Sequence, residues 1–361
     1  MKFKNIFLIL ALSLAFTACN NNKDMANDDK KVTSDENATN VNEKEEKSTI
    51  YASFYPIYNL TKQIAGDKFD VKSFTNLKTE SHDWEPSAKD MAEVSKAKLM
   101  FINGAGMEEW EDSLKNSTDI ELVNTSKDIE LIKASEEDDH DHDHDNEDTD
   151  HDHDHEHEDA DHDEDQDHDE DHDHEDANEE EHHHHHGEYD PHLWLSPKNA
   201  ISQAKVIAEK LSEIDPANKD YYMDNFKKIE DELEALIAEY KEKFDGCENK
   251  NFLVNHKAFS YLAKDFSLNQ IALTSLTSTE ETDAKTLKEA SLKAKELNIK
   301  TIFYEMGSSD KNAKTLADEI GADTKPLNTL ELATDENIKN DTSYQELVRE
   351  NLEAIYQSLV K

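Results

Sequence analysis

The sequence predicts an α/β protein with two lobes, each built on a parallel sheet, and one long rigid helix between them. Apolar segments of strand length alternate with helical patterns in both halves of the chain. One helical stripe of apolar side chains lies between the halves. An acidic segment interrupts the first half, so about 260 residues remain to fold, enough for two modest lobes.

Alternation of strands with helices accounts for both lobes. Helical patterns at 57–64 and 87–96 separate the apolar segments of the first half, and the second half repeats the scheme. Strands connected through helices run parallel, and the helices cover both faces of the sheet. The six expected strands are 49–54, 69–74, 98–103, 251–255, 268–273 and 300–304.

A helix of nearly 30 residues is expected at 216–244. At about 1.5 Å per residue it would be roughly 40 Å long, enough to run along two lobes. We therefore assign 49–214 to an N-terminal lobe, 215–246 to the linking helix and 247–361 to a C-terminal lobe. The apolar stripe of this helix consists of Tyr222, Phe226, Ile229, Leu233, Leu236, Tyr240 and Phe244.

The chain begins with the pattern of an exported lipoprotein. Two lysines precede the apolar run 6–18, which is too short to span a membrane and fits a secretory signal. The small residues before Cys19 are similar to a bacterial lipobox, although Phe16 stands where leucine is usual. We expect 1–19 to be the signal, Cys19 to be lipidated, and 20–48 to be a disordered tether on the extracytoplasmic side of a membrane. Ordinary signal cleavage is the alternative.

The formal net charge of −46 comes largely from one segment. Residues 136–188 contain 30 Asp or Glu and no Lys or Arg, which leaves about −16 for the rest of the chain. A segment with so few apolar side chains cannot offset its ordering entropy, and we expect a solvated, disordered insert. The acidity excludes nucleic acid as a partner, because phosphates are bound by Lys and Arg.

The histidines divide into two groups. Of the 19 in the chain, 16 lie in this insert, and the other three are His82, His192 and His256. Imidazole nitrogen is a ligand for Zn, Cu, Ni or Fe. Each solitary histidine precedes a helix at a strand or loop end, and parallel α/β sheets bind ligands at the carboxyl ends of their strands. One such histidine is commonly structural, but three at equivalent junctions indicate a metal site.

The segments around these histidines resemble the metal-site motifs of zinc-binding solute-binding lipoproteins of bacterial ABC transporters. The motifs are Glu-Ser-His-Asp-Trp-Glu-Pro-Ser at 80–87, Asp-Pro-His-Leu-Trp-Leu-Ser-Pro at 190–197 and Asn-His-Lys-Ala-Phe-Ser-Tyr-Leu-Ala at 255–263. The turn at 103–110 is also similar to that family, and the resemblance covers essentially 49–361. It implies two Rossmann-like lobes joined by the long helix, a metal in the cleft between them, and an ABC permease as partner.

The resemblance implies that His82, His192 and His256 bind one zinc ion, with a fourth ligand from the C-terminal lobe. Glu331 fits that position, while Glu305 and a water molecule are the alternatives. Such a set suits the tetrahedral N₃O coordination that zinc accepts. Manganese-binding relatives carry a carboxylate in place of His256, and three imidazoles favour zinc over manganese. Zinc is therefore the expected cargo.

The insert indicates a second kind of metal binding. Alternating His-Asp pairs can hold zinc in many interchangeable ways, each at the cost of ordering the loop, so individual affinities should be modest. We expect a zinc antenna that passes ions to His192, and a solvated acidic spacer is the alternative. The accessory histidines are His140, His142, His144, His151, His153, His155, His157, His182, His183, His184, His185 and His186.

Different classes of function predict different features. A zinc hydrolase needs an open coordination position beside a general base, and the chain has no His-Glu-x-x-His pair. The sequence is also compatible with a manganese-binding member of the same family, a surface adhesin or a zinc buffer. We expect a monomer without enzymatic activity. An internal disulfide is not expected, because Cys247 is the single cysteine after Cys19.

Overall fold

The computed structural model describes residues 47–78, 81, 84–134, 188–274 and 284–361. The predicted signal with Cys19, most of the tether, His82 and all sixteen histidines of the insert lie outside the described residues.

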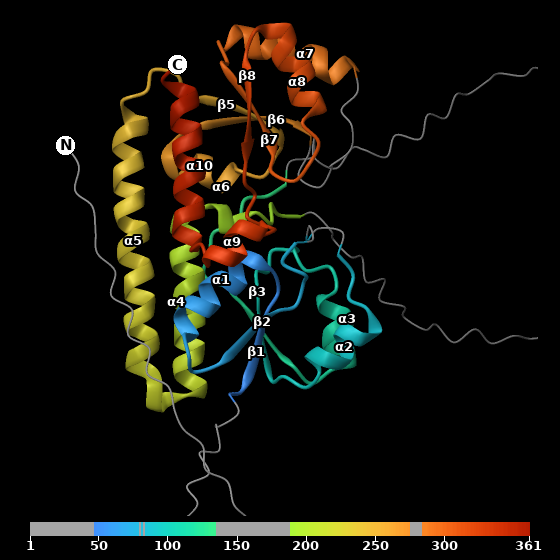
Figure 1. Ribbon diagram of the computed structural model, residues 1–361, viewed down its shortest axis with the longest axis vertical. Helices are drawn as coiled ribbons and strands as arrows, with labels where there is room; N and C mark the ends of the chain where they lie inside the picture. Colours follow the sequence, from blue (N-terminus) through green and yellow to red (C-terminus); the bar gives the residue numbers. More distant parts are fainter. Residues whose placement is uncertain (1–46, 79–80, 82–83, 135–187, 275–283) are drawn as a thin grey trace, which may run out of the picture. The chain divides into compact units, whose positions relative to one another are not determined.

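The N-terminal lobe contains a four-stranded parallel sheet in the order β2-β1-β3-β4. Figure 1 labels β1, β2 and β3 of this sheet. Its strands and the helices between them are β1 (Thr49–Ala52), α1 (Tyr55–Ala65), β2 (Asp70–Ser73), α2 (Ala88–Val94), β3 (Leu99–Ile102), α3 (Glu111–Ser117) and β4 (Glu121–Asn124). The lobe continues after the insert with the short helix η1 (Leu193–Leu195) and with α4 (Pro197–Ile214).

The C-terminal lobe repeats this plan with the strand order β6-β5-β7-β8, again wholly parallel. Its elements are β5 (Asn251–His256), α6 (Ser260–Phe266), β6 (Asn269–Thr274), α7 (Ala284–Glu296), β7 (Thr301–Glu305), α8 (Lys311–Ile320), β8 (Asp323–Leu327), α9 (Asp335–Asn340) and α10 (Tyr344–Leu359). The predicted class, two parallel α/β lobes, is confirmed.

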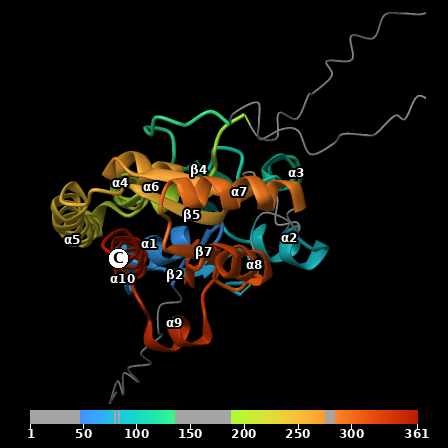
Figure 2. The same cartoon turned by 90° about the horizontal axis from the view of Figure 1, so that it is seen from above.

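The linking helix α5 (Lys219–Asp245) follows the short helix η2 (Pro216–Asn218). Its seven buried side chains are the seven of the predicted stripe. Helix α5 packs against α4 and α1 of the first lobe and against α10 and α6 of the second, and Figure 2 shows it beside α4 and α10. The predicted linking helix is therefore present, starting three residues after Pro216.

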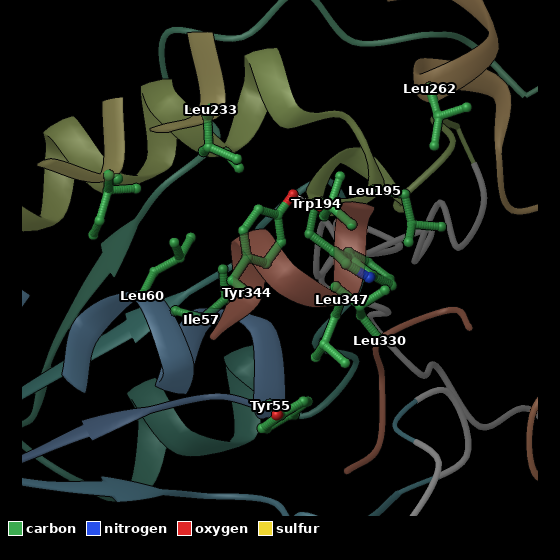
Figure 3. Close-up of a cluster of buried hydrophobic side chains, with 14 of the residues drawn as sticks. Tyr55, Ile57, Leu60, Trp194, Leu195, Leu233, Leu262, Leu330, Tyr344 and Leu347 are labelled. Atoms are coloured by element: carbon green, nitrogen blue, oxygen red, sulfur yellow. Dashed lines mark hydrogen bonds between the residues drawn. The ribbon is translucent and has the colours of Figure 1, made fainter. Parts of the chain in front are cut away.

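Both sheets are covered on two faces, as the buried clusters show. One cluster joins Met100 to α2 and α3, and another joins Ile302 to α7 and α8. The remaining faces share one core that includes side chains from both lobes and from α5. Figure 3 shows part of it, with Leu60 of α1, Leu233 of α5 and Tyr344 of α10 lying close together. The lobes are therefore joined by continuous apolar packing as well as by α5.

Six strands lie within two residues of the expected ranges, whereas β4 and β8 were not expected. Both are edge strands with mixed burial, and β8 contains Pro326, which a ladder tolerates at an edge. Among the helices of the described residues, none combines the length and the apolar character needed to cross a membrane.

Candidate metal centre

His192 is completely buried and is held by the carboxylate of Asp190, which is itself 1% exposed. Oδ1 of Asp190 accepts the backbone N–H of His192 at 2.9 Å and lies 2.9 Å from its Nδ1. The backbone bond is the short-range Asx turn that an Asp-Pro-His sequence favours. A carboxylate at Nδ1 keeps the proton there and leaves the lone pair on Nε2, the atom that can bind a metal.

His256 is the last residue of β5 and is 3% exposed. Its Nδ1 lies 3.3 Å from Oε2 of Glu305, the last residue of the neighbouring strand β7. The other oxygen of Glu305 accepts a hydrogen bond of 2.7 Å from the Thr329 hydroxyl. The parallel pairing of β5 with β7 thus places a carboxylate behind His256, as Asp190 lies behind His192.

The two imidazoles meet where the lobes join. Their ring centroids are 4.9 Å apart, with an interplanar angle of 78°. Next to His192, the Trp194 Nε1 donates to the Thr329 carbonyl at 2.7 Å, so the loop that supports Glu305 also supports η1. The structure therefore brings together two of the three predicted histidine ligands, one from each lobe.

Glu331 is 1% exposed and lies in the loop after β8. The backbone N–H of Ser81 donates to its Oε2 at 3.4 Å, and the Ala333 N–H donates to the Leu77 carbonyl at 2.6 Å. The segment that carries His82 therefore meets the Glu331 loop, although His82 itself is not described. Within the described part of the chain, no three His, Cys, Asp or Glu side chains gather as a metal site.

The backbone before Glu331 is strained. Leu330 is buried and has a φ of 61°, in the left-handed region that non-glycine residues rarely adopt. Its N–H donates to Oδ1 of Asn328 at 2.8 Å, and the backbone of Asn328 is held in turn by the side chain of Asn351 from α10. Such strain is typical of loops whose function requires one side chain in a fixed place.

The loop after β3 also supports the segment that carries His192. After β3, both carboxylate oxygens of the buried Glu108 accept backbone N–H groups, from Asn103 at 2.7 Å and from Gly104 at 2.9 Å. The Asn103 amide then donates to the Pro191 carbonyl at 3.0 Å. Burial raises the pKa of Glu108 to about 7. The glycines of this turn, Gly104 and Gly106, have positive φ and serve a tight turn that supports the histidine segment.

Two features lie apart from this junction. A pocket of about 770 Å³ opens at the first residues of β1 and β3, and its lysines, such as Lys72 and Lys98, are exposed. Parallel sheets bind ligands at the opposite ends of their strands. Cys247 follows α5 as a buried free thiol 3.5 Å from the Lys243 carbonyl, and burial raises its pKa. Neither feature enters the histidine site.

The sequence alone indicated His192, His256 and Glu331 but assigned no role to Asp190, and it named Glu305 only as an alternative ligand. The Asp-Pro-His order could have suggested Asp190, because an Asp side chain commonly binds the backbone two residues on. No local signal relates Glu305 to His256, because their contact depends on the strand order.

The family model of the zinc-uptake complex component A, periplasmic, matches residues 50–358. The high-affinity zinc uptake system protein ZnuA of Bacillus subtilis is 34% identical over 362 residues, covering 99% of this chain and 98% of that protein. The zinc-binding lipoprotein AdcA of Streptococcus pneumoniae is 32% identical over 325 residues, or 89% of this chain. The match spans 57% of the length of AdcA, so the chain corresponds to part of that protein.

Solved structures agree with the fold. The Zn(II)-bound ZnuA-like domain of Streptococcus pneumoniae AdcA has a TM-score of 0.66 and 28% identity, covering 88% of this chain and 100% of that domain. The laminin-binding protein of Streptococcus agalactiae, described as bifunctional with adhesin and metal-transporting activity, has a TM-score of 0.68 and 30% identity. That match covers 86% of this chain and 99% of the laminin-binding protein.

Proposed function

Because the chain belongs to the periplasmic zinc-uptake complex component A family, we propose that it captures Zn²⁺ outside the cytoplasm for an ABC importer. The observation that carries this proposal is the pair of buried imidazoles, His192 and His256, each backed by its own carboxylate. A carboxylate behind a histidine orients the ring and raises its basicity, the arrangement common around metal-binding imidazoles.

The proposed ligands are Nε2 of His192 and His256, together with His82 and a carboxylate oxygen of Glu331. Ser81 beside Glu331 supports this set, because it brings the His82 segment to the Glu331 loop. Glu305 is assigned the role of holding His256, because its two oxygens already face the His256 ring and the Thr329 hydroxyl. Three imidazoles and one carboxylate would complete a tetrahedral zinc shell.

Zinc selectivity follows from this donor set. Imidazole nitrogen suits zinc, whereas manganese prefers carboxylate, carbonyl and water oxygens. A closed four-ligand shell also leaves no position for the bound water that a zinc hydrolase requires. We therefore propose a solute-binding role without enzymatic activity, with delivery of zinc to a membrane permease.

The remaining parts of the chain extend this role. Lipidation at Cys19 and a tether at 20–48 would hold a monomeric protein at the outer surface of a membrane. The insert at 136–188 would act as a zinc antenna of modest affinity. The resemblance to a laminin-binding protein does not lead us to propose adhesion, because no described surface of this chain points to that partner.

The test is a zinc titration against a competing chelator, using protein that lacks 136–188. Replacing His82, His192 or His256 by Ala should lower zinc affinity at least tenfold, or about 1.4 kcal/mol. Thermal unfolding without zinc serves as the folding control for each variant. One tight zinc ion retained by the triple variant would show that the site lies elsewhere.

A further inference from the structure

Tyr261 connects the C-terminal lobe to the backbone on both sides of the insert. It is the second residue of α6 and is 3% exposed. Its hydroxyl donates to the Asp190 carbonyl at 2.8 Å and accepts the Ile132 N–H at 2.9 Å. One side chain thus binds the chain shortly before and shortly after the undescribed residues 135–187.

The two segments that Tyr261 contacts are paired with each other. Lys133 and Tyr189 form an antiparallel bridge, the Asp190 N–H donates to the Ile132 carbonyl at 2.8 Å, and the Ala134 N–H donates to the Glu188 carbonyl at 3.0 Å. We call these residues, 132–134 and 188–190, the stem. A two-stranded pairing of this length is marginal in water, so it depends on contacts with the rest of the fold.

The stem is continuous with the metal site. Asp190 holds His192 through its side chain while its carbonyl accepts the Tyr261 hydroxyl. Tyr261 in turn lies five residues after His256, on the helix that follows strand β5. Its hydroxyl therefore fixes the His192 segment, from the N-terminal lobe, to the helix that follows the strand carrying His256.

We propose that Tyr261 is a positioning residue, whose hydroxyl clamps the stem of the insert onto the C-terminal lobe and holds His192 against His256. This inference rests on the proposed function, since it assumes that the two histidines bind zinc. Burial raises the pKa of Tyr261 to about 12, so the hydroxyl keeps its proton and can donate at any pH suitable for zinc binding.

The experiment uses the full chain loaded with zinc and mixed with an excess of chelator. Weak insert sites should release zinc in a fast phase, and the histidine site should release it in a slow phase. Tyr261→Phe removes only the hydroxyl and with it two hydrogen bonds, so it should accelerate the slow phase by at least about fivefold, the scale of one lost buried hydrogen bond. The Ile132 amide, which loses its acceptor, should exchange its hydrogen faster in the same variant.

Tyr222→Phe is the matched control. Tyr222 is fully buried in α5 and donates its hydroxyl to Asp215 at 2.6 Å, away from the stem. This variant should keep the slow phase and the Ile132 exchange rate of the unmodified chain. Equal acceleration in both variants would indicate general loosening and overturn the role of Tyr261.

His192→Ala separates failure of this inference from failure of the proposed function. Loss of the slow phase in His192→Ala, with an unchanged slow phase in Tyr261→Phe, would reject the positioning role and leave the zinc site standing. A slow phase that persists in His192→Ala would reject the proposed site itself.

Discussion

Replacing Asp190 by Asn should weaken zinc binding although Asp190 is not a proposed ligand. The substitution keeps the size of the side chain but removes the negative charge 2.9 Å from Nδ1 of His192. The amide can also turn its NH₂ group toward Nδ1, which would favour the tautomer with its proton on Nε2. That tautomer has no lone pair on the atom proposed to bind zinc.

The expected loss is between tenfold and 100-fold in zinc affinity, the range seen when the partner of a metal-binding histidine is removed. This corresponds to about 1.4 to 2.8 kcal/mol. We expect the upper half of the range, because Asp190 is buried, where charge is weakly screened, and also fixes the backbone of His192.

The assay is competition with a zinc chelator at pH 7.5, using protein that lacks the insert. Asp215→Asn is the control, because Asp215 also accepts two side-chain hydrogen bonds, from Tyr222 and Asn218, without touching a histidine. The zinc-dependent rise in melting temperature should shrink for Asp190→Asn and stay for Asp215→Asn. Affinity within twofold of the parent for Asp190→Asn would refute the argument that this carboxylate supports ligation.

Three further outcomes are expected. Glu331→Ala should lower zinc affinity more than Glu305→Gln does, and the reverse order would make Glu305 the ligand. Deleting 136–188 should leave one tight zinc ion and remove the weaker ones, and loss of the tight ion on titration would make the insert the primary site. The pKa of Glu108 is about 7 in the folded protein and 4.5 in the unfolded chain, so ionising this side chain costs more in the folded state. The free energy of unfolding should therefore be highest below pH 4.5 and fall as pH rises through 7. In urea unfolding, the decrease in the free energy of unfolding from pH 5 to pH 8 should be about 2 to 3 kcal/mol smaller in Glu108→Gln than in the parent protein. An equal decrease in both proteins would reject this prediction.

The structure indicates that the chain can close across a deletion of 136–188. Removing 136–188 would join Ser135 to Tyr189 and leave two residues between the bridge partners Lys133 and Tyr189. Two residues is the commonest loop length in antiparallel hairpins. The deletion removes Glu188 and its bond to Ala134, but the Lys133–Tyr189 bridge and the bond from the Asp190 N–H to the Ile132 carbonyl can form without the insert, which keeps Asp190 and His192 in place for the measurement.

The fold was predictable because its signals are local. The seven-residue stripe of α5 and the apolar strand segments are periodic patterns that neighbouring residues create together. Strands β4 and β8 were not predicted, because their local apolar pattern is weak. Each has few apolar side chains, Leu122 and Val123 in β4 and Leu327 beside Pro326 in β8, whereas the predicted edge strand β2 is flanked by Phe69 and Phe74. Edge pairing depends on the sheet already formed beside it.

The site was predictable only in part for a similar reason. His192 and its motif lie in one continuous segment, and resemblance was enough to identify them. Glu305 and His256 are 49 positions apart, and Tyr261 and Asp190 are 71 apart. Only the strand order and the packing of α6 bring these pairs together. The side chains that contact the proposed ligands were therefore identified in the structure, whereas the ligands themselves were proposed from the sequence.

The packing also limits how such a site could release its ion. Helices α5 and α10 contact elements of both lobes, and one apolar core is shared between them. Opening the lobes widely would expose that core to water, which is costly because burial of apolar surface is the main stabilising term. The Glu331 loop belongs to the same core, because Leu330 and Ala333 on either side of Glu331 are buried in it. Movement of that loop would therefore have to draw Leu330 out of the core, and relief of its strained backbone would offset only part of that cost.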